Sequence, residues 1–169
     1  MANLYGLDMT GLVAKPPRQA PVGTAGGRDR VCHGTYRLLA GMADDDILFL
    51  CRIPTNARLT HIYMIWDDLG TTMTADLGLY EPQVAAGDTP VAVDDNLFLS
   101  AEALGTVQAI PVDALFDTLD QTTAGKRLWE MAALSEDPGG HFDLALTFDS
   151  VGTPTTGADI IWAVHYVRD

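Results

Sequence analysis

Basic residues are scarce in this 169-residue chain, which has 10 Lys and Arg against 23 Asp and Glu and a formal net charge of −13. A surface of that sign repels phosphate backbones, so binding of DNA or RNA is not expected. No apolar run approaches the roughly 20 residues that a membrane-spanning helix needs. The first residues also lack the basic and apolar regions of a secretory signal. We therefore expect a globular protein without a nucleic-acid or membrane partner.

Cysteine is rare as well. Cys32 and Cys51 stand 19 positions apart, each inside an apolar run that is typical of a strand. A buried thiol behaves as a small hydrophobic group, and nothing in the sequence indicates an oxidising compartment. We expect two free thiols in preference to a disulfide or a zinc site.

Motifs of catalysis and metal binding are missing. The chain has no G-x-S-x-G nucleophile elbow, no glycine-rich phosphate loop and no H-x-x-x-H or H-E-x-x-H spacing. Acidic clusters at 44–46, 67–68 and 94–95 lack the spacing of a calcium loop, and turns and solubilising charge explain them. We expect no enzyme activity, no metal and no cofactor.

The middle of the chain is instead rich in strand patterns. Strict alternation of apolar and polar residues is typical of strands with one buried face. Between 44 and 80, three such segments follow one another, separated by turns at 54–57 and 69–72. This pattern predicts an antiparallel meander in which one face is buried. The residues expected on the buried face of the first and third segments are Ile47, Phe49, Cys51, Ile53, Met73, Ala75, Leu77 and Leu79.

Two later strands are predicted near the C-terminus. In the first, the even-numbered residues from Phe142 to Phe148 are apolar and should face the core, with the odd-numbered residues toward water. The second, Ile160–Val167, is apolar on both faces, so both faces need a cover. We expect the core to cover the face that carries Trp162. A second copy of the chain should cover the other face, and the predicted oligomer contacts are Ile161, His165 and Val167.

The remaining elements are shorter. The sequence predicts a strand over 31–39 and an edge or bulged strand over 106–115, because Pro111 cannot donate a ladder hydrogen bond. Asp94–Asn96 is a plausible N-cap for a short helix over 97–104, and 125–134 is compatible with helical turns or a strand. Short strands separated by Gly, Pro and Asp turns predict an all-β fold, a jelly-roll-like β-sandwich, for residues 30–169.

Residues 1–29 differ from this body. Their Gly and Pro content prevents a long helix or central strand, yet apolar residues are frequent. Residues 1–30 carry a net charge of +2, whereas the rest carries −15. We expect an extended N-terminal arm that lies on a neighbouring subunit; packing back on its own domain is the alternative. The predicted arm contacts are Leu4, Tyr5, Leu7, Met9, Leu12, Val13, Lys15 and Arg18.

Several short motifs together resemble one protein family. ANLYGLDMTG is similar to an LYGxxYT opening, with Met9 where an aromatic residue is common, and GGRDRV to a GGRxRV entry into the first strand. DDLGTTMTADLGLY, the DPGGHFDL segment and the closing IIWAVHYV strand extend the likeness over most of the chain. The sequence thereby resembles the decoration, or cement, proteins on the heads of tailed bacteriophages.

The resemblance implies a virion structural protein, made in the host cytoplasm, that stabilises the shell from its outer surface. The implied partners are the major capsid protein and further copies of the chain, most simply as a homotrimer. Two alternatives remain open at this point. One is a tail or collar component of the virion. The other is a carbohydrate-binding β-sandwich module, in which Trp66, Trp129 and Trp162 would form a sugar platform.

Overall fold

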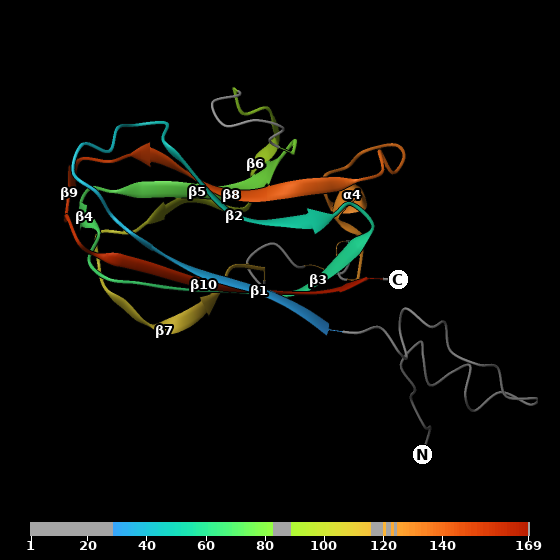
Figure 1. The fold of residues 1–169 in the computed structure, drawn as a ribbon, viewed down its shortest axis with the longest axis horizontal. Helices are drawn as coiled ribbons and strands as arrows, with labels where there is room; N and C mark the ends of the chain where they lie inside the picture. Colours follow the sequence, from blue (N-terminus) through green and yellow to red (C-terminus); the bar gives the residue numbers. More distant parts are fainter. Residues whose placement is uncertain (1–28, 83–88, 116–119, 121–122, 124, 169) are drawn as a thin grey trace, which may run out of the picture.

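The computed structural model describes residues 29–82, 89–115, 120, 123 and 125–168. In this part of the chain, two layers of antiparallel strands lie face to face (Figure 1). The predicted arm contacts from Leu4 to Arg18 lie outside the described residues. Among the described residues, no helix has the length and apolar character needed to span a membrane.

Each layer is a four-stranded sheet. Sheet A consists, in spatial order, of β1 (Asp29–Arg37), β10 (Asp159–Arg168), β3 (Ala57–Trp66) and β7 (Gln108–Asp113). Sheet B consists of β2 (Ile47–Pro54), β8 (His141–Ser150), β5 (Thr74–Tyr80) and β6 (Ala92–Ala103). The short strands β4 (Gly70–Thr71) and β9 (Thr153–Pro154) pair with each other, and the helix α4 spans Leu128–Met131.

The order of the strands is that of a jelly roll. Along the chain the long strands alternate between the sheets, except that β5 and β6 follow each other in sheet B. The first and last long strands, β1 and β10, are neighbours in sheet A, and β2 lies beside β8 in sheet B. Two antiparallel sheets wound in this way form a double-sheet jelly roll. The predicted all-β sandwich is confirmed.

The space between the sheets is filled by one apolar core. Every even-numbered residue of β8 from Phe142 to Phe148 is buried, as the alternation predicted, and so are Met73, Ala75, Leu77 and Leu79 around β5. From sheet A, Trp66 and Trp162 are buried in the same cluster. Burial on this scale supplies the main driving force for folding.

One predicted helix is wrong. Residues 97–103 belong to β6, a twelve-residue strand, and Asp94–Asn96 lie inside it. The strand pairs with β5 along its length, for example Leu77 opposite Leu99, with several register shifts. The hydrogen bonds of a long neighbouring strand outweighed a local capping signal. In contrast, the ambiguous segment 125–134 contains the helix α4, and β7 with Pro111 is an edge strand as predicted.

In the first half of β2, the side chains point to the opposite faces from those predicted. Phe49 pairs with Ala145 and Cys51 with Leu144, so Leu50 is an additional residue in the ladder, a β-bulge. The bulge shifts the alternation by one position. As a result, Leu50 is buried and Phe49 is exposed, whereas Ile53 beyond the bulge faces the core as expected.

The odd-numbered residues of β8 also differ from the prediction. Asp143 is only 4 % exposed and Ala145 is 0 % exposed, and Thr147 is partly buried. Side chains of sheet B itself cover this outer face, as described below. Alternation along a strand gives the side to which a residue points, but it does not show what lies over that side.

Candidate interaction face

The outer face of sheet A carries regular rows of side chains across β1, β10 and β3. Because alternate residues of β10 enter the core, the intervening ones point outward. Cross-strand pairing aligns them with outward residues of the neighbouring strands. The rows are Val31–His165–His61, His33–Ala163–Tyr63 and Thr35–Ile161–Ile65, and we call this surface the A face.

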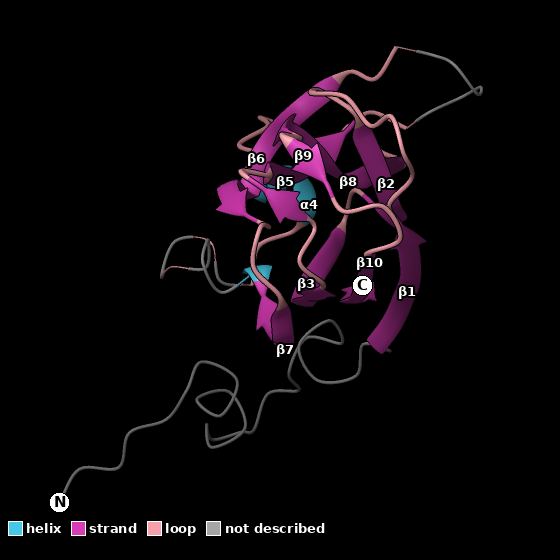
Figure 2. Ribbon diagram, turned by 90° about the vertical axis from the view of Figure 1, so that its left-hand side faces the viewer, coloured by secondary structure: helices cyan, strands magenta, loops and turns pink. Residues whose placement is uncertain are grey.

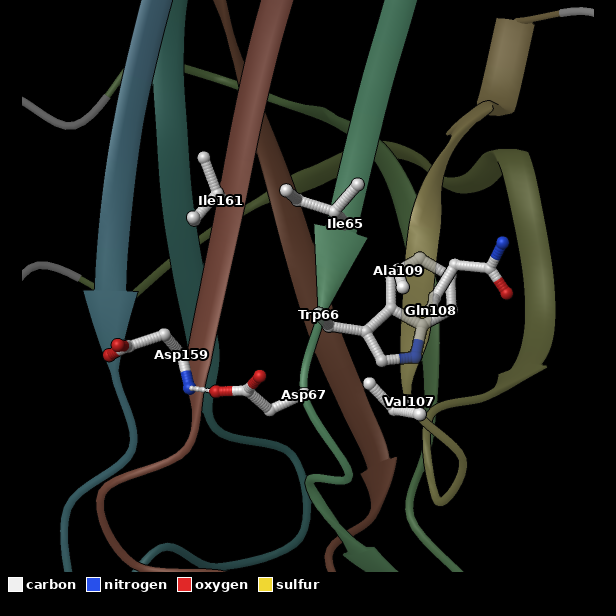
Figure 3. Close-up of a pocket in the computed structure, with 8 residues that line it drawn as sticks. All are labelled: Ile65, Trp66, Asp67, Val107, Gln108, Ala109, Asp159 and Ile161. Atoms are coloured by element: carbon white, nitrogen blue, oxygen red, sulfur yellow. Dashed lines mark hydrogen bonds between the residues drawn. The ribbon is translucent and has the colours of Figure 1, made fainter.

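The centre of the A face is apolar and open. Two hollows of about 210 and 240 Å³ share Ile65 and Ile161 as lining residues. Figure 3 shows these two isoleucines side by side on β10 and β3, with Ala109 of β7 and the adjacent Val107 beyond them. Ile161 is 42 % exposed and Val107 is 55 % exposed. An apolar surface of this kind, on the outer side of a complete sandwich, has no cover within the described chain.

One end of the A face is closed by charged groups. Arg37 donates two hydrogen bonds to the carboxylate of Asp159, of 2.8 and 2.7 Å. This contact lowers the pKa of the Asp159 carboxyl, chiefly through the hydrogen bond. The backbone N–H of Asp159 in turn donates to the carboxylate of Asp67, at 2.9 Å (Figure 3). These groups fix the ends of β1, β10 and β3 relative to one another.

The other end of the A face holds two histidine–aspartate pairs. Nδ1 of His61 lies 2.6 Å from Oδ2 of Asp113, and Nδ1 of His165 lies 3.1 Å from Oδ2 of Asp29. The ring of Tyr63 stacks on His61 at a centroid distance of 5.0 Å and meets His165 edge-on at 5.8 Å. Each imidazole is therefore oriented by a carboxylate on a neighbouring strand. The rings of His61, Tyr63 and His165 contact one another at this end of the A face.

The outer face of sheet B, in contrast, is covered by long side chains of its own strands. Arg52 of β2 forms two hydrogen bonds, of 2.6 and 2.8 Å, with the carboxylate of Asp143 on β8. Tyr80 meets the ring of Phe49 edge-on at 6.1 Å, and its hydroxyl lies 2.5 Å from that of Thr147. These long side chains lie over the small residues of β8, which explains the burial of the odd-numbered positions.

Backbone also covers sheet B. A Cβ added to Gly78 of β5 would lie 2.1 Å from the carbonyl oxygen of Asp94 and 2.3 Å from the carbonyl carbon of Asp95. The strand β6 therefore passes directly over β5 at this glycine, and no other residue would fit. The close approach requires Gly78 and leaves little of this face available to a partner.

Acidic residues gather on the sheet B side. Burial raises the pKa of the Asp149 carboxyl, with further contributions from the charge and hydrogen bond of Asp76 and from the charges of Asp95 and Asp45. Among the described residues, no set of three or more His, Cys, Asp or Glu is arranged to hold a metal ion. One cluster of carboxylates, around Asp149, thus lies on the side of sheet B.

The residues predicted for the oligomer contact lie together on β10. Ile161 and His165 belong to the A face, and Val167 follows on the same side of the strand. The sequence analysis missed the contributions of β1, β3 and β7, such as Tyr63 on β3 and Ala109 on β7. The alternation of Leu59–Trp66 contained a signal for β3, but only the pairing of β3 with β10 shows that its outward residues adjoin Ile161.

The tryptophans do not form a surface platform. Trp66 is 4 % exposed, and its indole N–H donates to the carbonyl oxygen of Thr106. Trp162 is 7 % exposed, and its indole N–H donates to the carbonyl oxygen of Leu50. Two of the three side chains required by the carbohydrate-binding alternative are thus core residues.

Comparison with solved structures places this fold among chains of phage capsids. The chain is similar to a chain in the capsid of Ralstonia phage GP4, with 22% sequence identity, a TM-score of 0.64 and coverage of 90% of this chain and 92% of that chain. It is also similar to a chain in the capsid asymmetric unit of cyanophage Pam1, with 18% identity, a TM-score of 0.55 and coverage of 90% and 93%. No family model and no curated protein matches the sequence.

Proposed function

We propose that this protein is a structural component of a phage virion, and that it decorates and stabilises the outer surface of the head. The observation that carries the proposal is an apolar, uncovered sheet face on a jelly roll similar, over 90% of its length, to chains of two phage capsids. The motifs that resemble head decoration proteins support the same function. The role is structural, and it needs no catalytic group, cofactor or metal.

The A face is the proposed contact between copies of the chain. Its centre, with Ile65 and Ile161, is apolar. Burial of this apolar area against a neighbouring copy favours association. A trimer fits the threefold positions that an icosahedral shell offers, and it is the oligomeric state that we propose.

The N-terminal arm is the proposed contact with the shell. Its apolar residues, Leu4, Tyr5, Leu7, Met9, Leu12 and Val13, would bind an apolar surface of a neighbouring subunit, and Lys15 and Arg18 would favour an acidic one. The partners are the major capsid protein and adjacent copies of this chain. A protein that binds only the assembled shell stabilises it by mass action, by about 2.7 kcal/mol per site at a hundredfold excess over Kd.

The copy number in purified virions tests the position of the protein. Quantitative mass spectrometry against the major capsid protein should give hundreds of copies per particle if the protein decorates the head. A few copies per particle would instead place it in the tail or collar, the remaining structural alternative.

Substitution on the A face tests the proposed contact. Ile161→Asp or Val167→Asp should abolish self-association, because an unpaired charge in an apolar contact is costly. Both should leave the melting curve of the monomer nearly unchanged. Val91→Asp is a matched control, since Val91 is 50 % exposed and lies outside the A face. Analytical ultracentrifugation and capsid co-sedimentation are the measurements. Variants that associate and decorate capsids as the parent does would contradict the assignment.

A further inference from the structure

A third hollow lies at one end of sheet B and shares no lining residue with the A face. Its volume is about 600 Å³, which exceeds that of the two A-face hollows together. Its apolar lining includes Val93 on β6, Phe142 on β8 and Leu134 after α4, and Glu81 adds a carboxylate. Val93 and Leu134 are only partly buried. We call this hollow the B groove.

One wall of the B groove is a loop with a fixed conformation, residues 137–140. The hydroxyl of Thr55 donates to Oδ1 of Asp137 at 2.6 Å, and the backbone N–H of Gly139 donates to the same oxygen at 2.9 Å. Gly139 and Gly140 have φ values of 73° and 81°, in the region that favours glycine. The DPGG segment thus builds a preformed wall, and the decoration role by itself does not require one.

The N-terminal arm joins the body at the same end of the sandwich. Asp29, the first described residue, pairs with Val167 near the end of β10. At the neighbouring end of sheet B, His141 of the B groove pairs with Pro54, and the turn that follows leads to Ala57 beside the end of β10. Figure 1 shows the start of β1 and the end of β10 at the same end as α4.

We propose that, in the free protein, the B groove holds the apolar segment 4–13 of the arm of the same chain. The two surfaces match in chemistry. Six apolar residues of the arm (Leu4, Tyr5, Leu7, Met9, Leu12 and Val13) suit the apolar lining, and their burial favours the contact. Lys15 and Arg18, which follow this segment, complement the carboxylates of Glu81 and Asp137.

The length of the chain permits this contact. Residues 14–28 separate the apolar segment from Asp29 and can extend over about 50 Å. Figure 2 shows the two four-stranded sheets stacked on each other. Such sheets lie about 10 Å apart, and each is about 15 Å wide across four strands. A tethered segment also has an effective concentration of about 1 mM at its own groove, so it binds there before it binds another copy.

The contact would keep the apolar arm out of water until a shell subunit takes its place. This consequence rests on the proposed function, in which the arm binds the shell. The contact between the arm and the B groove does not, because it belongs to the free protein. Both experiments below therefore use the full-length protein without capsids, so their outcome is independent of decoration.

Hydrogen exchange of three full-length proteins tests the contact. The parent is compared with a Leu7→Asp, Leu12→Asp double variant, whose charges are costly in an apolar groove, and with Thr10→Asp as the matched control. Amides in 91–93 and 139–142 should exchange about threefold or more faster in the double variant than in the parent and the control. Amides of β3 should exchange equally in all three, because the substitutions lie outside the body. Equal exchange at the groove, or a change on β3 and β10 instead, would overturn the proposal.

Zero-length crosslinking with a carbodiimide identifies the chain that supplies the arm. Lys15 is one of only two lysines in the chain, and the other is Lys126. In an equal mixture of unlabelled and ¹⁵N-labelled protein, Lys15 should couple to Glu81 or Asp137 within chains of one label. Glu81→Gln should remove the first product. The proposal is overturned if Lys15 is absent from products at these two carboxylates, or if the coupled chains carry mixed labels.

Discussion

At the scale of single residues, β8 separates two kinds of burial. Leu144 and Leu146 enter the core between the sheets and are 0 % exposed. Thr147 lies on the opposite side, where its hydroxyl contacts that of Tyr80 at 2.5 Å. The first kind of burial depends on apolar packing and the second on a surface hydrogen bond, so substitutions at the two sites should differ in cost.

We expect Leu144→Ala or Leu146→Ala to lower the free energy of unfolding by about 2–5 kcal/mol, because each removes apolar contacts and leaves a cavity. Thr147→Ala should cost about 1 kcal/mol, the net value of a typical hydrogen bond. Denaturant titration of the three variants measures these differences. Equal, small effects at all three positions would show that the facing of β8 is wrong.

A second residue-scale prediction concerns Asp149. Its pKa is raised, so the folded state holds a proton more firmly than the unfolded chain does, and ionisation at neutral pH lowers stability. Asp149→Asn should increase the free energy of unfolding at pH 7 by up to about 0.5 kcal/mol, a small gain because water still reaches this partly desolvated side chain and screens its charge. The gain should decrease as the pH falls through the folded pKa and vanish below the ordinary carboxyl pKa, about 3.9.

Asp159→Asn is the matched control, because the expected change in stability at pH 7 has the opposite sign. Its pKa is lowered by Arg37, so its ionised form contributes stability above the ordinary carboxyl pKa, and this is lost as the pH falls through the lowered value. Asp159→Asn should therefore destabilise the protein at pH 7, where Asp149→Asn stabilises it. Paired urea titrations at pH 7 and near pH 4.5 compare the two. The same sign for both variants at pH 7 would contradict the assignment of these charges.

At the scale of elements, the packing of β1 on its neighbour β10 requires a glycine at position 34. It pairs only with β10 among the described strands, and Gly34 lies opposite Trp162. The indole occupies the space where a side chain of residue 34 would begin. A glycine in a strand normally weakens it, but here it permits Trp162 to reach Leu50 in the other sheet.

We expect Gly34→Ala to destabilise the protein by about 1–3 kcal/mol, because the methyl group must displace a buried indole. The intrinsic tryptophan fluorescence should change with it. Thr35→Ala, at the adjacent exposed position of the same strand, is the control and should change stability little. If both substitutions are tolerated equally in thermal unfolding, the close packing of Trp162 on β1 is not correct.

At the scale of the whole molecule, the arm and the body have separate proposed tasks. Deletion of residues 2–27 should leave a folded body, because the two sheets and the apolar core between them are built from residues 29–168. We expect this truncated protein to keep its circular dichroism spectrum and its self-association but to lose binding to capsids. Co-sedimentation with capsids, with the full-length protein as reference, measures the loss. Decoration as tight as that of the full chain would exclude the arm as the capsid contact.

The two outer faces of the sandwich differ in how well they are covered. Sheet B covers itself with Arg52, Tyr80 and the strand β6, and it carries the acidic cluster around Asp149. Sheet A leaves Ile65 and Ile161 open. A partner that buries apolar area is therefore expected on sheet A, and solvent on sheet B.

The sequence by itself determined the class of the fold. Apolar alternation with period two, interrupted by Gly, Pro and Asp turns, is a local property, and it predicted β2, β3, β5, β8 and β10 and the even-numbered core residues of β8. The predicted apolar character of both faces of Ile160–Val167 likewise followed from residue types alone. The expectation of a structural role came from the motifs that resemble head decoration proteins.

Only the tertiary structure decided which residues meet. The bulge at Leu50 reversed the facing of Phe49, and pairing with β5 made a strand of residues 97–103 despite a helical capping signal. The pairing of Ile161 with Ile65 depends on strands that are far apart in the chain. Strand pairing and sheet stacking set such contacts through long-range hydrogen bonds and packing, which no local pattern encodes.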